Sequence, residues 1–202
     1  MRECRPHPFA ANTRVARGFT LLELIVTITL LGILVALSLP SFTGWIRNSQ
    51  VRTVAEALQN GVRTAQTEAV RRNQEIVMTF TNDSNPQLNP TALAGGKNWA
   101  VQTIPSAFAN DGLAEFIRSG VMADVASAVA IGSGPATICF NSNGRLTTSA
   151  VVATCSVGTA TFDVGQPPGA DRPLRVLIQA GGQVRMCDPA RVLSSTVPDG
   201  CP

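Results

Sequence analysis

The sequence has little histidine, few aromatic residues and little charge. Of its 202 residues one is histidine, His7, tyrosine is absent, aromatic residues make up 5% and charged residues 14%. Catalytic triads and Cys-His pairs need a histidine beside the nucleophile, so a single histidine near the N-terminus argues against both. It argues equally against a histidine-ligated metal. The 17 glycines and 13 prolines favour a loop-rich, strand-rich body over a helical bundle.

The positive charge is concentrated at the N-terminus. Four arginines and one glutamate give residues 1–18 a net charge of +3, which equals the net charge of the whole chain. Residues 19–202 are therefore neutral overall. If the first segment is removed, no global charge attracts DNA or anionic lipid, and binding of a polyanion requires a local cluster.

A long apolar run follows, and it carries one carboxylate near its start. From Phe19 to Ile46 the run covers 28 residues, and about 20 residues suffice to cross a bilayer. It is longer than the apolar core of a secretory signal peptide, and no A-x-A-like site clearly closes it. A simple signal anchor with its arginine-bearing end in the cytoplasm explains the run but not Glu23. An ionisable residue in a span is costly and usually marks a site with a partner.

The stretch RGFTLLELIVTITLLGILVALSLP resembles the N-terminus of type IV pilins and of type II secretion pseudopilins. The resemblance implies that a prepilin peptidase cuts after Gly18 and that Phe19 becomes N-methylated. It also implies that Glu23 pairs with the terminal amine of a neighbouring subunit during assembly. We therefore expect a leader peptide (1–18) and a transmembrane and assembly helix (19–46). The protein would cross the bacterial inner membrane once, with its C-terminal domain in the periplasm, before incorporation into a pilus or pseudopilus.

Helical periodicity continues past the span. Gly32 is a weak point, and Pro40, which lacks an amide hydrogen, is expected to kink or locally melt the helix. Residues 47–75 predict an amphipathic periplasmic helix, about seven turns beyond Pro40, whose narrow apolar stripe packs on its own domain. The stripe consists of Val51, Ala55, Leu58, Val62, Ala65 and Ala69.

From residue 76 onward short apolar runs alternate with turns, which predicts antiparallel β-structure. Residues 81–98 are expected to form a surface loop. Asn143-Gly144 and Ala180-Gly181-Gly182 predict turns. The predicted strands are Ile76–Phe80, Trp99–Thr103, Ala114–Arg118, Ala128–Ile131, Thr137–Phe140, Ala160–Val164, Leu174–Gln179 and Val184–Cys187.

Four cysteines follow the span, and in the periplasm disulfides between them would persist. Four cysteines allow three pairings. The local pairing closes two loops and would stabilise the fold by roughly 3 kcal/mol for each bond. Metal binding is the alternative, but no C-x-x-C pair is present, so we expect structural disulfides, no metal and no cofactor. In the local pairing Cys139 joins Cys155 and Cys187 joins Cys201.

The C-terminal body resembles the GspH/FimT group of minor pilins and pseudopilins. The long helix, the Asn-Gly-Arg turn at 143–145 and the stretch PLRVLIQAGGQVRMCDPA carry this resemblance. It implies an α+β fold in which a long N-terminal α-helix, membrane-spanning in its first half, packs on a pilin-like antiparallel β-sandwich (76–202). Some FimT proteins resemble DNA receptors for natural transformation and use a G-R-x-R motif. Here Gln183 replaces the first arginine of that motif, and Arg185 supplies the second.

Four arginines near the C-terminus are the candidates for DNA contact. Two aspartates oppose them, and the resulting net charge of about +2 would give at most a few phosphate contacts and a shallow salt dependence. The stretch has no aromatic side chain on which bases could stack. A solvated edge with ordinary surface charges is the alternative. The four candidates are Arg172, Arg175, Arg185 and Arg191.

The leading interpretation is a minor type IV pilin of the FimT kind, a structural component of pilus assembly with a possible DNA contact during natural transformation. The alternative is a GspH-like minor pseudopilin of the type II secretion system. No recognisable carboxylate pair and no base for a serine support an anchored enzyme, so no enzymatic activity is expected. The expected partners are other pilin or pseudopilin subunits, the prepilin peptidase, the inner membrane and, in the DNA-binding interpretation, DNA.

Overall fold

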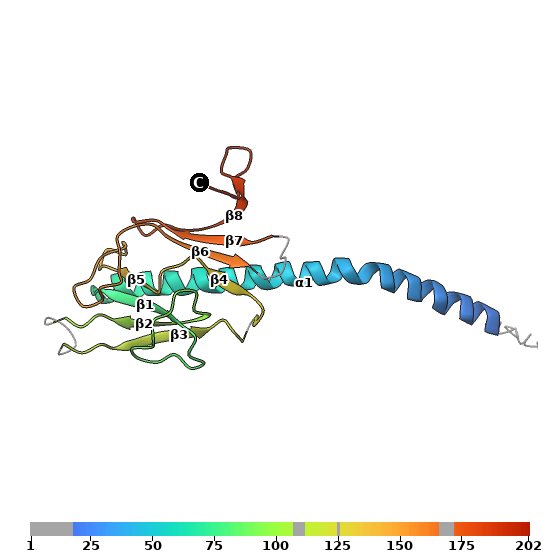
Figure 1. Ribbon diagram of the computed structural model, residues 1–202, viewed down its shortest axis with the longest axis horizontal. Helices are drawn as coiled ribbons and strands as arrows, with labels where there is room; N and C mark the ends of the chain where they lie inside the picture. Colours follow the sequence, from blue (N-terminus) through green and yellow to red (C-terminus); the bar gives the residue numbers. More distant parts are fainter. Residues whose placement is uncertain (1–17, 107–111, 125, 166–171) are drawn as a thin grey trace, which may run out of the picture. The chain divides into compact units, whose positions relative to one another are not determined.

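The computed structural model describes residues 18–106, 112–124, 126–165 and 172–202, with the backbone alone for residues 39–41. Of the expected leader peptide (1–18), residues 1–17 lie outside the described part. By packing, the chain divides after Ser41 into two compact units. One long helix precedes the strands (Figure 1). The elements are α1 (Leu21–Arg72), β1 (Ile76–Thr81), β2 (Asn98–Thr103), β3 (Phe116–Val121), β4 (Ala130–Gly132), β5 (Thr137–Phe140), β6 (Ala160–Gly165), β7 (Leu174–Ile178), β8 (Val184–Val192) and β9 (Gly200–Cys201).

The second half of α1 buries one face in the domain that follows it. The six stripe residues expected from the sequence are all fully buried, together with Val54. The helix ends at a left-handed residue, Asn73, whose φ is 52°. The amide of Asn73 donates to the carbonyl of Val70, and the amide of Gln74 donates to that of Ala69. This is a Schellman arrangement, which satisfies the last carbonyls of the helix and turns the chain into β1.

The first sheet has the strand order β3-β2-β1-β5, and every pair in it is antiparallel. All residues of β1, β2 and β5 are buried, because both faces of these strands are covered. One face packs on α1. Part of the other face is covered by the loop between β1 and β2. The side-chain nitrogen of Gln102 in β2 donates a hydrogen bond of 2.6 Å to the side-chain oxygen of Asn89 in this loop.

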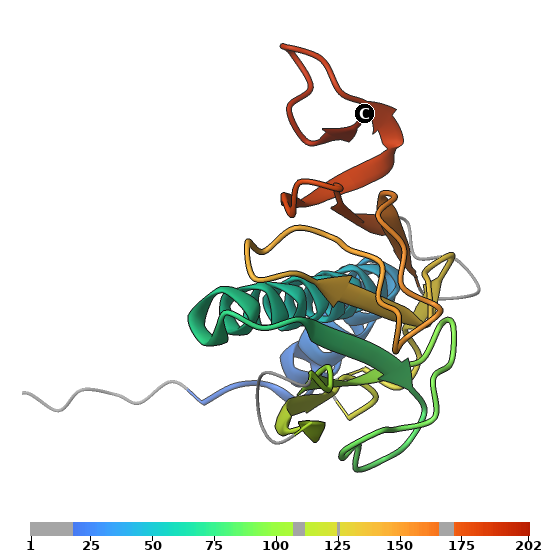
Figure 2. The same ribbon diagram turned by 90° about the vertical axis from the view of Figure 1, so that its left-hand side faces the viewer.

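The second sheet has the order β4-β6-β7-β8-β9. Burial alternates along β6, as expected for a strand with one face in the core. The inner faces of the two sheets and the buried face of α1 share one hydrophobic core. Phe80 of β1 and Phe162 of β6 meet there with ring centroids 4.7 Å apart. Figure 2 shows the strands of the two sheets on two sides of the teal part of α1.

The expected fold class, a long helix packed on antiparallel sheets, is confirmed, and several details differ. The strand expected at Ala114–Arg118 begins two residues later, because the main chain and hydroxyl of Thr103 first bind the main chain of Glu115. β8 continues five residues beyond the expected end at Cys187. Its last part pairs with β9, which was not expected, and this pair is parallel.

Pro40 does not melt the helix. α1 continues through Gly32 and Pro40 without a break. A proline inside a helix removes one amide donor, and the hydrogen-bond ladder on either side of it holds the helical conformation here. A kink at these two positions stays a prediction.

Candidate assembly site and candidate nucleic-acid interface

The first turn of α1 is capped by the residues of the N-terminal motif. The hydroxyl of Thr20 accepts a hydrogen bond of 3.2 Å from the amide of Glu23. Thr20 is therefore the N-cap, and Glu23 stands three positions later, as in a capping box. A carboxylate in the first turn also interacts favourably with the helix dipole. Glu23 thus has a local role in the helix that sequence reasoning missed, although the T-x-x-E spacing signals it.

The segment after Glu23 is largely apolar, and its side chains are exposed in the single chain. Every described side chain from Gly18 to Ser38 is exposed. Of the described part, α1 is the one helix long and apolar enough to cross a membrane, with a mean hydropathy of 2.5 over its best window. Thr27, Thr29 and Ser38 each donate their hydroxyl proton to a carbonyl one turn earlier, at 2.8–2.9 Å. These bonds satisfy the donors without water, which suits a segment surrounded by lipid or by other helices.

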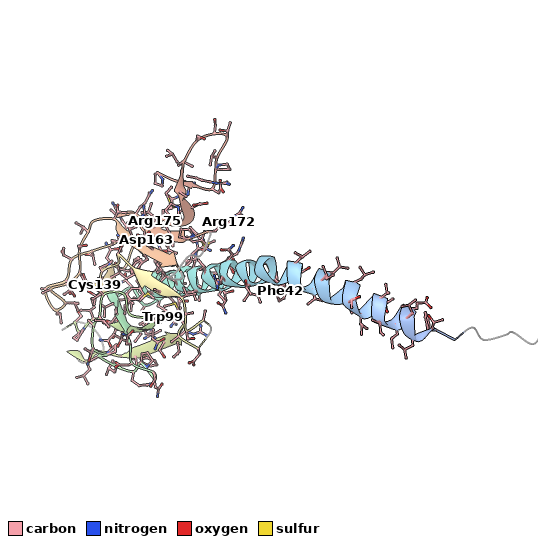
Figure 3. All side chains as sticks on the ribbon, turned by 45° about the vertical axis from the view of Figure 1, so that its right-hand side comes forward. Phe42, Trp99, Cys139, Asp163, Arg172 and Arg175 are labelled. Atoms are coloured by element: carbon pink, nitrogen blue, oxygen red, sulfur yellow. A yellow bond between two sulfur atoms is a disulfide. The ribbon has the colours of Figure 1, made fainter. Side chains whose placement is uncertain are left out.

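Three of the four candidate arginines are held by partners within the domain. Arg175 donates to Asp163 at 2.6 Å, and Figure 3 shows the two side chains next to each other. This contact raises the pKa of the Arg175 guanidinium. Arg191 pairs with Asp199 at 2.8 Å.

Arg185 lies at the second arginine position of the FimT motif, and it points back into its own chain. Its guanidinium donates to the carbonyl of Pro198 at 2.6 Å and to that of Gly200 at 3.3 Å. Arg172 is exposed and makes no ion pair with any residue that the structure describes. The structure therefore does not gather the four arginines into one free cluster. Of the four, Arg172 alone forms no ion pair or hydrogen bond that compensates its charge within the described residues.

The turn just before Arg185 is tied to a second turn by one side chain of α1. The side-chain nitrogen of Gln66, Nε2, donates to the carbonyl of Gly144 at 2.8 Å and to the carbonyl of Gly182 at 3.0 Å. Both glycines have positive φ, 71° and 88°. Sequence reasoning missed Gln66, although a glutamine directly after the buried Ala65 was the available signal.

Both pairs of cysteines form the local disulfides. Cys139 is bonded to Cys155, and Cys187 is bonded to Cys201. The first bond lies in a small cluster outside the main core. The second closes the C-terminal loop, which stands away from the sheets in Figures 1 and 2.

A charged network ties the end of α1 to the first sheet. Glu68 accepts hydrogen bonds from Arg71 at 2.6 Å and from Arg72 at 2.9 Å. Arg72 also reaches Glu115, just before β3, at 2.7 Å. The two arginines lower the pKa of the Glu68 carboxyl, chiefly through these hydrogen bonds. The network links the last turn of α1 to the residue before β3.

The family described as Type II transport protein GspH matches residues 54–182, more than half of the chain. The chain belongs to the GspH family. The prokaryotic N-terminal methylation motif matches residues 13–39, which include the cleavage and methylation positions expected from the sequence. The family and the motif together make the chain a minor pilin or pseudopilin, of a type IV pilus or of type II secretion.

Individual proteins and solved structures match parts of the chain. Two fimbrial proteins of Pseudomonas aeruginosa are each 33% identical over 69 residues, 34% of this chain, and the chain spans 44% of the length of these relatives. The crystal structure of the type IV minor pilin FimU of Pseudomonas aeruginosa shares the fold. It has a TM-score of 0.51 and 16% identity, over 72% of this chain and 96% of that one. The minor pseudopilin EpsH of the Vibrio cholerae type 2 secretion system overlaps less well, with a TM-score of 0.46 and 12% identity over 70% and 99%.

Proposed function

We propose that this protein is a minor subunit of a type IV pilus, of the FimT kind, that enters the fibre through the first half of α1. Its role is structural rather than catalytic. One observation carries the proposal, namely the exposed apolar segment with a single carboxylate in its first turn. An apolar surface of this length has to be covered by lipid or by other subunits. Before assembly the inner membrane covers it, and in the fibre the helices of neighbouring subunits do so.

Glu23 pairs with the terminal amine of the next subunit in this proposal. The change Glu23→Val should leave the protein processed and inserted in the membrane but poorly incorporated into fibres. Thr20→Ala is the matched control, because it removes the cap of the same turn, worth about 1 kcal/mol, and keeps the carboxylate. Incorporation is measured as the fraction of subunit in sheared fibres. Normal incorporation of the Glu23 variant contradicts the pairing, and an equal loss in the Thr20 variant attributes the defect to a weakened first turn rather than to the lost pairing.

Processing by a prepilin peptidase occurs between Gly18 and Phe19 in this proposal. Replacing Gly18 should leave the full-length precursor in the membrane, visible as a band that does not shift on an immunoblot. A normal mature band from the Gly18 variant would place the cut elsewhere. This test is independent of fibre type, since pilins and pseudopilins share the motif.

A GspH-like pseudopilin of type II secretion is the second candidate, favoured by the description of the matching family. The two candidates differ in what a deletion strain loses. If the protein is a pilin, the deletion strain loses surface pili and still exports folded proteins. If it is a pseudopilin, the deletion strain keeps its pili and loses export. Counting pili and assaying exported enzymes in the same strain separates them.

Contact with DNA is the finer part of the proposal, and Arg172 is its best-placed residue. Arg185 already donates two hydrogen bonds within the chain, whereas Arg172 is exposed. We expect Arg172→Ala to reduce the salt dependence of duplex binding by about one unit of slope, as loss of one phosphate contact does. Arg185→Ala should change it less. Binding of duplex DNA by the full chain in detergent is measured across a salt series. No binding at low salt, together with unaltered DNA uptake in a deletion strain, refutes the proposed DNA contact.

A further inference from the structure

An exposed aromatic pair lies at the start of the second unit. Both residues belong to α1, and the rings of Phe42 and Trp45 stack on each other with centroids 6.0 Å apart. Their exposed fractions are 58% and 66%. Neither belongs to the buried core. In the sequence they follow the apolar segment directly, since about 20 residues counted from Leu21, enough for one span, end at Pro40. Tryptophan is among the residues enriched where a bilayer meets water.

Trp45 forms part of one wall of a groove of about 530 Å³ within the second unit. Further residues of α1 continue this wall. The remaining lining comes from Arg172, the start of β7, β8 and the loop before β9, namely Leu174, Met186, Cys187, Asp188 and Asp199. The groove therefore places β-sheet residues on the same face of the domain as the exposed indole.

The free charge on this face is positive. Arg191 forms ion pairs with both carboxylates of the groove, Asp188 at 3.7 Å and Asp199 at 2.8 Å. Arg172 lines the groove. Arg47 follows Trp45 by two residues on α1, so it lies on another side of the helix, about 3 Å further along its axis. Neither of these two arginines forms an ion pair with the residues that the structure describes. These two uncompensated guanidinium groups, one in the groove and one on another side of α1 close to the level of Trp45, match a surface that presents phosphate above hydrocarbon.

We propose that Phe42 and Trp45, with Arg47 and Arg172, dock the second unit on the phospholipid surface of the bilayer that holds the preceding span. The rings lie at the level of the headgroups, and the guanidinium groups contact lipid phosphates. The inference rests on the proposed membrane anchoring and adds a second, reversible contact to it. Entry into a fibre then requires that this contact is broken.

Tryptophan fluorescence tests the docking, because the chain has two tryptophans and the other, Trp99, is 7% exposed. The full chain is reconstituted in phosphatidylethanolamine–phosphatidylglycerol vesicles that carry a spin label on a fraction of the headgroups. Emission of the Trp45→Phe variant is subtracted as the signal of Trp99. We expect the headgroup label to quench Trp45 and the vesicles to protect it from aqueous iodide.

Two charge variants test the arginines. Arg47→Gln combined with Arg172→Gln should lose quenching by the headgroup label, and added salt should do the same to the unchanged chain. The matched control combines Arg63→Gln with Arg145→Gln, which removes the same charge from two exposed arginines outside the groove. Equal loss in the control pair refutes the assignment of the contact to this face.

The docking and the anchoring fail in different ways. Flotation of the vesicles after carbonate extraction reports whether the span is inserted. A chain that floats but leaves Trp45 open to iodide and unaffected by the label overturns the docking and leaves the anchoring intact. A chain that carbonate extracts overturns both.

Discussion

Replacement of Gln66 should loosen the domain by detaching two turns from the helix at once. Its amide nitrogen donates to the carbonyls of Gly144 and Gly182, which belong to turns more than 30 residues apart in sequence. Both glycines are buried. In Gln66→Leu the side chain keeps its bulk and loses both donors, so two buried carbonyl oxygens lose a partner that water replaces poorly.

The expected loss follows from the two hydrogen bonds. At about 1 kcal/mol for each typical bond, the free energy of unfolding falls by about 2 kcal/mol. For a chain of this size, that corresponds to a decrease in Tm of about 4–8 °C. Gln66→Glu should cost more, because it turns a carboxylate toward two carbonyl oxygens and adds a buried charge without a partner.

Thermal unfolding of the full chain in detergent, followed by circular dichroism, measures the effect. Gln59→Leu is the matched control, since Gln59 lies on the same helix and its side chain makes no hydrogen bond with the described residues. A Tm of the Gln66→Leu variant equal to that of the control refutes the reasoning. A glutamate variant that is more stable than the leucine variant refutes the electrostatic part alone.

Three further predictions concern packing, charge and covalent closure. Gly61→Ala should lower Tm by several degrees, because a Cβ there would lie 2.8 Å from the indole of Trp99. The cost of overpacking, about 1–3 kcal/mol, outweighs the gain in helix propensity. A rise in Tm would contradict this close packing. The lowered pKa of Glu68 means that its contribution to stability is complete above its unfolded-state pKa and is lost as pH falls through the lower folded value. The Tm difference between the unchanged chain and Glu68→Gln should therefore shrink as pH falls below the unfolded-state pKa of the carboxyl, and a constant difference would show that the ion pairs contribute nothing. Replacing Cys187 and Cys201 by serine should lower the free energy of unfolding by about 3 kcal/mol, the value for a loop of this length, which denaturant titration under oxidising conditions can test.

Periodicity predicted the parts of the fold in which burial alone decides the structure. The stripe from Val51 to Ala69 repeats at helical spacing, and each residue of it is buried as expected. Thr137–Phe140 was predicted with the observed bounds, since a short apolar run between turn residues is buried on both faces. The same logic cannot find β9, because two residues have no period. Its position is fixed by pairing with β8 and by the bond from Cys201 to Cys187.

The N-terminal motif could be read from the sequence because its chemistry is local. The expected cleavage position, the carboxylate and the apolar run are neighbours in the chain. The first lies just before α1, and the other two lie within it. The capping bond between Thr20 and Glu23 is local as well. Gln66 differs, because its two acceptors are brought together only when both turns reach the helix.

The arginines near the C-terminus show how strand register decides which charges remain free. Arg175 and Asp163 stand twelve residues apart, yet antiparallel pairing of β6 with β7 places them directly opposite each other, where the ion pair forms. The C-terminal loop returns through β9 and brings two carbonyls to Arg185. A count of charges assigns these arginines to a binding surface, whereas the strand pairing uses them to hold sheet and loop together. The charge available to a polyanion is therefore set by which residues face each other across strands. Arg172, the candidate that stands outside any strand, is for that reason the one that the proposed DNA contact and the proposed lipid contact share.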